Sequence, residues 1–303
     1  MKNARPEFQK EFKVDYANAI AGFAKTIQKF PLKKILYRSL FRGKGLEFES
    51  YRNFQPGDDA SMIDWKASLR GDKLLAKKYI EERDLNVYFL VDISNSTLFG
   101  SGDKLKAEYA AECCAALGHL IHSLGDNIGL IMFNDKIKKY IPAKSGRNQF
   151  NLLFKTLSNP EEYGGNFDLE QAAKFALDFI KTDYTVIILV SDFINLKRNA
   201  KKSLNILTNR FETIALMVRD SMDDELPKLN YQLSISDPYS SKTMVVDPKM
   251  TAEGYKINAI KQKKGVINLF RDCNVDLLEL NSSESFFTPL AGFLRSRSQG
   301  KVQ

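Results

Sequence analysis

The sequence predicts an α/β fold: a doubly wound, mostly parallel sheet with helices on both faces, preceded by a small N-terminal helical and β-rich appendage. From residue 86 onward, apolar runs of strand length alternate with amphipathic segments of helix length. The runs at 87–91 and 184–190 are apolar at nearly every position, which is typical of strands covered by helices on both faces. The alternation of strand and helix predicts that successive strands lie parallel in one sheet.

The expected elements follow one another in chain order. Strands are expected where short apolar runs lie between polar turns, at 87–91, 127–133, 136–141, 184–190, 213–218 and 275–279. Helices are expected where apolar residues recur with helical spacing, at 103–124, 147–157, 168–181, 199–210, 249–272 and 285–297. After a polar loop, the segments 231–235 and 244–246 are expected to form a short hairpin.

Three segments divide the chain. Residues 1–44 are expected to form a basic helical N-terminal arm, interrupted at Pro31 because proline breaks a helix interior. Residues 45–85 are expected to be β-rich, since they contain extended runs separated by turns and no long helical pattern. Residues 86–298 carry the alternating strands and helices of the main domain.

Positive charge is concentrated near the N-terminus. The formal net charge of the whole chain is +8, and residues 1–46 alone contain eleven Lys or Arg against three acidic residues. Such an arm could contact nucleic acid, anionic lipid or an acidic protein face. A solvated helix face is the favoured interpretation.

The sequence predicts a cytoplasmic protein without a membrane span. No apolar stretch approaches the roughly 18 residues needed to cross a bilayer, and the first residues lack the apolar core of a signal peptide. The three cysteines, Cys113, Cys114 and Cys273, do not suggest a disulfide framework.

Oxygen-bearing side chains follow two of the expected strands. Asp92, Ser94 and Ser96 come directly after the strand at 87–91, and Asp192 follows the strand at 184–190. Ligands in open α/β sheets bind at the carboxyl ends of strands, so these four residues are expected to form one site. Hard oxygen ligands suit Mg²⁺ or Mn²⁺. Without a family resemblance, the favoured interpretation of Asp92, Ser94 and Ser96 is that they cap the following helix or form turns.

These motifs resemble a known family. The Asp-x-Ser-x-Ser sequence with a later Ser-Asp is similar to the metal-ion-dependent adhesion site of von Willebrand factor A domains. Three N-terminal segments, together with Arg219-Asp220 and Glu225-Leu226-Pro227, resemble the bacterial and archaeal family called domain of unknown function 58. The three segments are GLEFESYRNFQPGDD at 45–59, IDWKAS at 63–68 and YIEERD at 79–84. The resemblance covers about residues 35–290 and implies a von Willebrand factor A-like, Rossmann-like fold.

The resemblance also implies how a metal would be held: the serines ligate it directly, and the aspartates ligate it directly or through water. One departure concerns the threonine that the adhesion site normally carries between its two aspartates. The matching stretch, Gly164 to Leu169, contains no threonine but offers Asn166 and Asp168 as alternative ligands, either of which would change the coordination shell. A metal-free loop is the alternative, and metal binding is favoured over it.

Other candidate residues are interpreted structurally. Asp64 and Lys66 are expected to satisfy local hydrogen bonds beside an anchoring Trp65. His119 and His122 share a helix face, but no third histidine exists to complete a metal site. The sequence contains no P-loop of the Gly-x-x-x-x-Gly-Lys type.

The expected function is therefore that of a non-enzymatic protein-interaction module that binds a partner through a Mg²⁺ or Mn²⁺ site. The resemblance implies a MoxR-type AAA+ ATPase as the partner, with a role in assembly or chaperone-like work. The alternatives are a nucleic-acid-associated protein that uses the basic N-terminal arm and, less favoured, a metal-dependent hydrolase.

Overall fold

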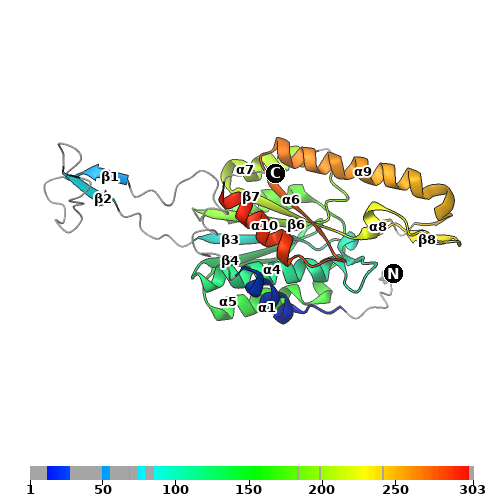
Figure 1. Ribbon diagram of the computed structural model, residues 1–303, viewed down its shortest axis with the longest axis horizontal. Helices are drawn as coiled ribbons and strands as arrows, with labels where there is room; N and C mark the ends of the chain where they lie inside the picture. The colour runs from blue at the N-terminus through cyan, green and yellow to red at the C-terminus, as the bar shows by residue number, and fades with distance from the viewer. Residues whose placement is uncertain are drawn as a thin grey trace.

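A six-stranded sheet organises the chain (Figure 1). The computed structural model describes residues 12–27, 50–54, 68, 74–78 and 85–299, except 183, 198 and 241. The strand order is β10-β7-β6-β3-β4-β5, in which β5 is antiparallel to β4 and all other neighbours are parallel. The strands are β3 (Asn86–Asp92), β4 (Asn127–Phe133), β5 (Ile137–Lys144), β6 (Thr185–Ser191), β7 (Glu212–Arg219) and β10 (Asp276–Asn281). The predicted doubly wound, mostly parallel sheet is confirmed.

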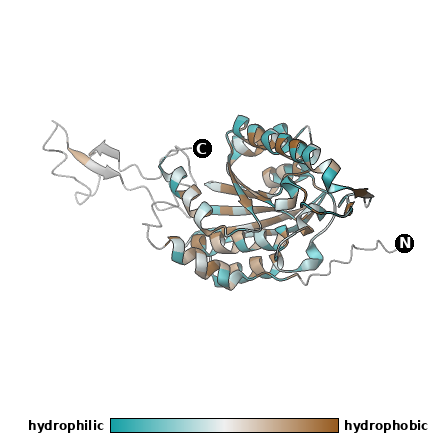
Figure 2. Ribbon diagram, turned by 45° about the vertical axis from the view of Figure 1, so that its right-hand side comes forward, coloured by the Kyte–Doolittle hydropathy of each residue, from teal (hydrophilic) through white to brown (hydrophobic). Residues whose placement is uncertain are grey.

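Helices cover both faces of this sheet, and each face has its own apolar core. One core lies beneath α1 (Tyr16–Ile27), α4 (Lys106–Ser123), α5 (Arg147–Leu157) and α10 (Phe287–Ser298). The other lies beneath α6 (Leu169–Phe179), α7 (Ala200–Arg210) and α9 (Pro248–Asp272). The inner strands are buried along almost their whole length, and Figure 2 shows them in brown between helices that carry teal residues.

Helix α1 belongs to the main body of the molecule. The sequence places it in a separate arm, whereas its buried residues Ala19, Phe23 and Ile27 join the core formed by α4 and α10. The apolar stripe on α1 explains this position, because an isolated amphipathic helix is stabilised mainly by packing that stripe. The remaining basic residues of the expected arm lie largely outside the described residues.

Among the described residues of the expected β-rich segment, β1 (Ser50–Asn53) pairs antiparallel with β2 (Leu75–Lys78). Asp64, Trp65 and Lys66 lie outside the described residues. The expected hairpin also forms, from β8 (Leu233–Ser236) and β9 (Thr243–Val246). Within the described ranges, no helix is both long enough and apolar enough to cross a membrane.

Three short helical turns were not expected from the sequence. They are η2 (Asn95–Leu98), η3 (Pro160–Glu162) and α8 (Ser221–Asp224). Such segments are too short to display a helical period. Two of them, η2 and α8, begin at the carboxyl ends of β3 and β7 and so shape the edge of the sheet where ligands bind in folds of this class.

Candidate functional site

The candidate site lies at the carboxyl ends of β3 and β6. These strands are hydrogen-bonded parallel neighbours with Val91 opposite Val190, so the residues that follow them emerge at the same edge of the sheet. The structure thereby brings the Asp92 loop and Asp192 together, although 99 residues separate Asp92 from Ser191 in the chain.

Asp92 is held rigidly at the end of β3. Its carboxylate is 1% exposed and accepts two hydrogen bonds, from the Ser94 amide at 2.8 Å and from the Ser191 hydroxyl at 2.6 Å. The first of these bonds turns the loop after β3, and the second ties this loop to β6. Both carboxylate oxygens are therefore engaged.

The two serines of the loop also point into this site. Ser94 and Ser96 are buried, and their Oγ atoms lie 3.3 Å apart. Ser96 also interacts with the Asp192 carboxylate, although burial and Lys106 have larger effects on the pKa of that group. All four residues that the sequence selects first, Asp92, Ser94, Ser96 and Asp192, thus occupy one buried polar cluster.

The turn after β6, which carries Asp192, contains a residue with an unusual backbone conformation. The next residue, Phe193, is fully buried and adopts φ 51°, in the left-handed region that bulky residues rarely occupy. The Asp192 carboxylate accepts a hydrogen bond from the Ile194 amide at 3.1 Å. Strained backbone of this kind tends to occur at functional sites, where the surrounding packing maintains it.

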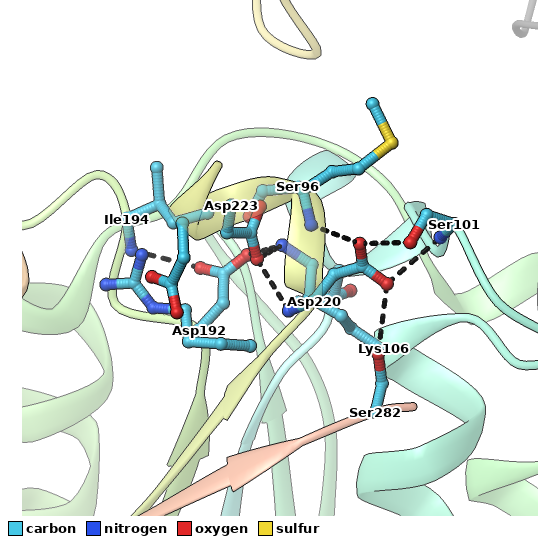
Figure 3. Close-up of polar contacts among 12 residues, drawn as sticks. Ser96, Ser101, Lys106, Asp192, Ile194, Asp220, Asp223 and Ser282 are labelled. Carbon is cyan, nitrogen blue, oxygen red and sulfur yellow. Dashed lines mark hydrogen bonds and ion pairs between the residues drawn. The ribbon is translucent and has the colours of Figure 1, made fainter. Parts of the chain in front are cut away.

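A buried lysine that the sequence analysis did not select neutralises Asp192. The Nζ atom of Lys106, the first residue of α4, lies 2.8 Å from Asp192 and 2.8 Å from Asp223 on α8, as Figure 3 shows. Burial would lower the pKa of this ammonium, but the two carboxylates hold it above its ordinary value. A lysine at a helix N-terminus opposes the helix dipole, and this was the available sign that Lys106 has a specific partner.

Asp220 fixes the loops around the cluster. Its carboxylate accepts hydrogen bonds from Ser101, from the Met222 amide and from the Ser282 hydroxyl (Figure 3). It therefore links the loop before α4, the start of α8 and the loop after β10. In the sequence, Arg219-Asp220 is recognisable only as part of a family pattern, because the partners of Asp220 meet only in the fold.

The two carboxylates of the cluster, Asp92 and Asp192, differ in how far their negative charge is compensated. Burial and the negative charge of Asp192 raise the pKa of Asp92 to about 7, despite the hydrogen bonds that Asp92 accepts. Burial also opposes ionisation of Asp192, but Lys106 outweighs it and lowers the pKa of Asp192 below its ordinary value. One of two facing carboxylates is thus compensated by a cationic side chain and the other is not.

The loop that lacks the expected threonine borders the site. Gly164 and Gly165, both with positive φ, dock against the β3 loop, where Asn95 exchanges hydrogen bonds with Gly165. Asn166 next to them is exposed. Asp168 is directed elsewhere: it caps α6 through the Glu170 amide and pairs with Lys197 at 2.8 Å.

A tyrosine from a distant hairpin completes the polar cluster. The hydroxyl of Tyr239, between β8 and β9, donates to the Ser96 oxygen at 2.8 Å and lies 3.3 Å from the Ser94 oxygen. Nothing in the local sequence around Tyr239 indicated this contact, because 143 residues separate it from Ser96.

The donor set fits a hard divalent cation. It offers two carboxylates and two hydroxyls, which are the oxygen ligands that Mg²⁺ and Mn²⁺ prefer. Burial and the charge of Asp192 raise the pKa of Asp92, and a cation between the two carboxylates would relieve the repulsion between them. Over the described part of the chain, no three His, Cys, Asp or Glu side chains cluster to hold a metal, so a metal here would need the serine hydroxyls.

Lys106→Met is expected to destabilise the protein strongly. The substitution keeps the length of the side chain but leaves Asp192 and Asp223 without their shared cation, and breaking a buried ion pair costs about 3–5 kcal/mol. Lys201→Met is the matched control, because Lys201 and Asp272 form an exposed pair for which the expected loss is below about 1 kcal/mol. Urea denaturation measures both free energies of unfolding, and equal losses would contradict this account of Lys106.

Asp92→Asn is expected to stabilise the metal-free protein in a pH-dependent manner. The folded-state pKa of Asp92 is about 7 and its ordinary value is 3.8, so the folded state favours the protonated form and loses stability as pH rises from about 4 to 7. An amide is neutral at every pH and escapes this loss. In chelator, the melting temperature of Asp92→Asn should therefore exceed that of the wild type by a margin that grows up to about pH 7. Each kcal/mol of difference in the free energy of unfolding corresponds to roughly 2–4 °C. A difference that stays constant between pH 4 and 8 would refute the raised pKa.

Comparison with known proteins places the chain in a family. A family model described as "Protein of unknown function DUF58" matches residues 50–265. An uncharacterized protein of Mycobacterium tuberculosis is 26% identical over 266 residues, covering 87% of this chain and 83% of the relative. The uncharacterized protein YeaD of Bacillus subtilis is 29% identical over 109 residues, which is 36% of this chain and 25% of that protein.

Solved structures with a similar arrangement include BatB, a conserved hypothetical protein of Bacteroides thetaiotaomicron. It is 17% identical, with a TM-score of 0.42 over 71% of this chain and 99% of that one. The von Willebrand factor A domain of SpRpn10 is 12% identical, with a TM-score of 0.37 over 69% of this chain and 94% of that one. Since the family model spans more than half of the sequence, the chain belongs to the DUF58 family of proteins of unknown function.

Proposed function

We propose that this protein is a non-enzymatic interaction module that holds Mg²⁺ or Mn²⁺ at the ends of β3 and β6 and uses it to bind a carboxylate of a partner protein. The observation that carries the proposal is the convergence of two buried carboxylates and two serine hydroxyls at one edge of the sheet. The proposed ligands are Asp92, Ser94, Ser96 and Asp192, acting directly or through water.

Charge supports a cation at this position. Asp92 and Asp192 repel each other in a buried setting, and Lys106 compensates only Asp192. A divalent ion would supply the missing positive charge and favour the ionised form of Asp92. Because Lys106 already holds one oxygen of Asp192, that residue is more readily reached through a water molecule than directly.

Incomplete coordination by the chain supports the binding of a partner. An octahedral ion has six positions, and magnesium usually keeps several waters when few protein ligands are present. Four protein oxygens would leave positions that a Glu or Asp of another protein could take. A bound divalent ion is the strongest local charge in such a site and would favour an anionic visitor.

The loop from Gly164 to Leu169, which lacks the usual threonine, offers two candidates for an additional metal ligand. Asn166 is exposed beside the docked Gly165 and remains a candidate for an additional amide ligand. Asp168 is occupied as the cap of α6 and by Lys197, which argues against its participation. A shell without this second anionic ligand retains more attraction for an acidic partner group.

The use of both carboxylates as ligands favours binding over catalysis. Asp92 accepts hydrogen bonds from Ser94 and Ser191, and Asp192 is bonded to Lys106. If both also ligate the metal, neither is left to act as the general base that a hydrolase needs. The proposed partner, from the resemblance of the sequence motifs to this family, is a MoxR-type AAA+ ATPase.

Titration with Mg²⁺ and Mn²⁺ is expected to show binding to the wild-type protein and a loss of at least about tenfold in affinity for Asp92→Asn. The substitution keeps the size of the side chain and removes its charge, which is a principal source of affinity for a hard cation. Asp168→Asn is the control and should bind as the wild type does, because Asp168 faces α6. Isothermal calorimetry measures all three, and binding to Asp92→Asn as tight as to the wild type would rule out Asp92 as a ligand of the metal.

Binding of the ATPase is expected to depend on both the metal and Asp92. Pull-down of a MoxR-type ATPase from the same organism should succeed in Mg²⁺, and it should fail in chelator or with Asp92→Ala. Capture that is equal in all three conditions would refute the metal bridge while leaving the protein contact intact. Asp168→Asn again serves as the matched control, since it also removes one carboxylate from the same edge of the sheet.

A further inference from the structure

The tip of the β8–β9 hairpin sits on the proposed metal site. Tyr239 extends from this tip, and its hydroxyl contacts the oxygens of Ser94 and Ser96. These two serine oxygens are themselves 3.3 Å apart, so the phenol oxygen lies within hydrogen-bond reach of both. A second contact, from the Asn95 side-chain amide to the Pro238 carbonyl at 2.8 Å, holds the same tip against the same loop.

Hydrogen bonds within the hairpin tip and packing on the core hold Tyr239 in position. Asp237 and Lys242 close the hairpin through a backbone hydrogen bond of 2.8 Å. The carboxylate of Asp237 also accepts a hydrogen bond from the Tyr239 amide at 2.9 Å. The Tyr239 ring packs against the apolar core on the α6, α7 and α9 face of the sheet. Tyr239 is therefore positioned by its own turn and by the domain.

The rest of the hairpin is weakly attached to the domain. It forms a separate two-stranded sheet outside the six-stranded one, and an isolated pair of strands is marginally stable in water. Met244 and Val245 on β9 are 66% and 64% exposed. The hairpin can therefore move without breaking any hydrogen bond of the central sheet.

A cation and the Tyr239 hydroxyl compete for the same serine oxygens. A magnesium ion bound to both serines would lie about 2.1 Å from each oxygen and use their lone pairs. The phenol uses a lone pair of Ser96 and directs its positively polarised hydrogen at that oxygen.

We propose that the β8–β9 hairpin is an internal lid, in which the Tyr239 hydroxyl occupies the serine oxygens until a divalent cation and the partner's carboxylate displace it. The proposal rests on the proposed metal site and adds its regulation. It predicts that the lid lowers the affinity for the cation and that loading of the site releases the hairpin tip.

Tyr239→Phe tests the lid, because it removes only the hydroxyl and keeps the packed ring. We expect Mg²⁺ to bind the variant about tenfold more tightly in calorimetry, since loss of a net hydrogen bond or two shifts an equilibrium by roughly that factor. Tyr231→Phe is the matched control on the approach to the same hairpin, where the ring is 63% exposed, and it should bind as the wild type does. Hydrogen exchange of residues 233–246 should accelerate when Mg²⁺ is added to the wild type, and in Tyr239→Phe without Mg²⁺.

The outcomes separate this inference from the proposed function. Tighter binding by Tyr239→Phe, or binding by this variant alone, supports the lid. Equal affinities with unchanged exchange of 233–246 overturn the lid and leave the metal site in place. Weaker binding by Tyr239→Phe also overturns it, because Tyr239 would then be a ligand. If neither the wild type nor Tyr239→Phe binds Mg²⁺ or Mn²⁺, the metal site itself fails and the lid fails with it.

Discussion

The proximity of the buried Asp92 and Asp192 carboxylates, at the ends of two adjacent strands, is the constraint on which the rest of the site depends. The parallel pairing of β3 with β6 fixes this arrangement, because it places both carboxylates at the same buried edge of the sheet. Two unpaired charges could not remain there without compensation. The compensation comes from the ammonium of Lys106, the hydroxyl of Ser191 and the backbone amides of Ser94 and Ile194.

This compensation also determines the shape of the neighbouring loops. Lys106 can reach Asp192 only because α4 begins directly beside the ends of the strands, and it brings Asp223 of α8 with it. Asp220, at the end of β7, then secures α8, the loop before α4 and the loop after β10. Hydrogen bonds to a few buried carboxylates thus connect the loops that follow β3, β6, β7 and β10.

The sequence predicted the fold well because its inner strands are continuous apolar runs and its helices are amphipathic, so the two kinds of segment can be told apart along the chain. It also selected Asp92, Ser94, Ser96 and Asp192, since strand ends in this class of fold converge by topology. It did not find Lys106 or Tyr239, because their roles depend on side chains that are distant in sequence and on the orientation of one helix and one hairpin. It placed α1 in a separate arm because a helical period reveals an apolar stripe but not the surface that covers it.

The attachment of the hairpin at its two ends explains how the lid could move while the charge cluster stays in place. The hairpin lies between Leu226 and Pro248, both of which are buried. Beyond Pro248, α9 is fastened to α8 by a hydrogen bond from the Tyr255 hydroxyl to the Met222 carbonyl at 2.8 Å. Met222, which accepts this bond, lies on the same short helix as Asp223, which pairs with Lys106. Helices α8 and α9 are therefore both connected to the charge cluster. Displacement of Tyr239 would then cost the contacts of the hairpin tip, which are its hydrogen bonds to Ser96 and Asn95 and the packing of the Tyr239 ring on the core, while the charge cluster stays in place.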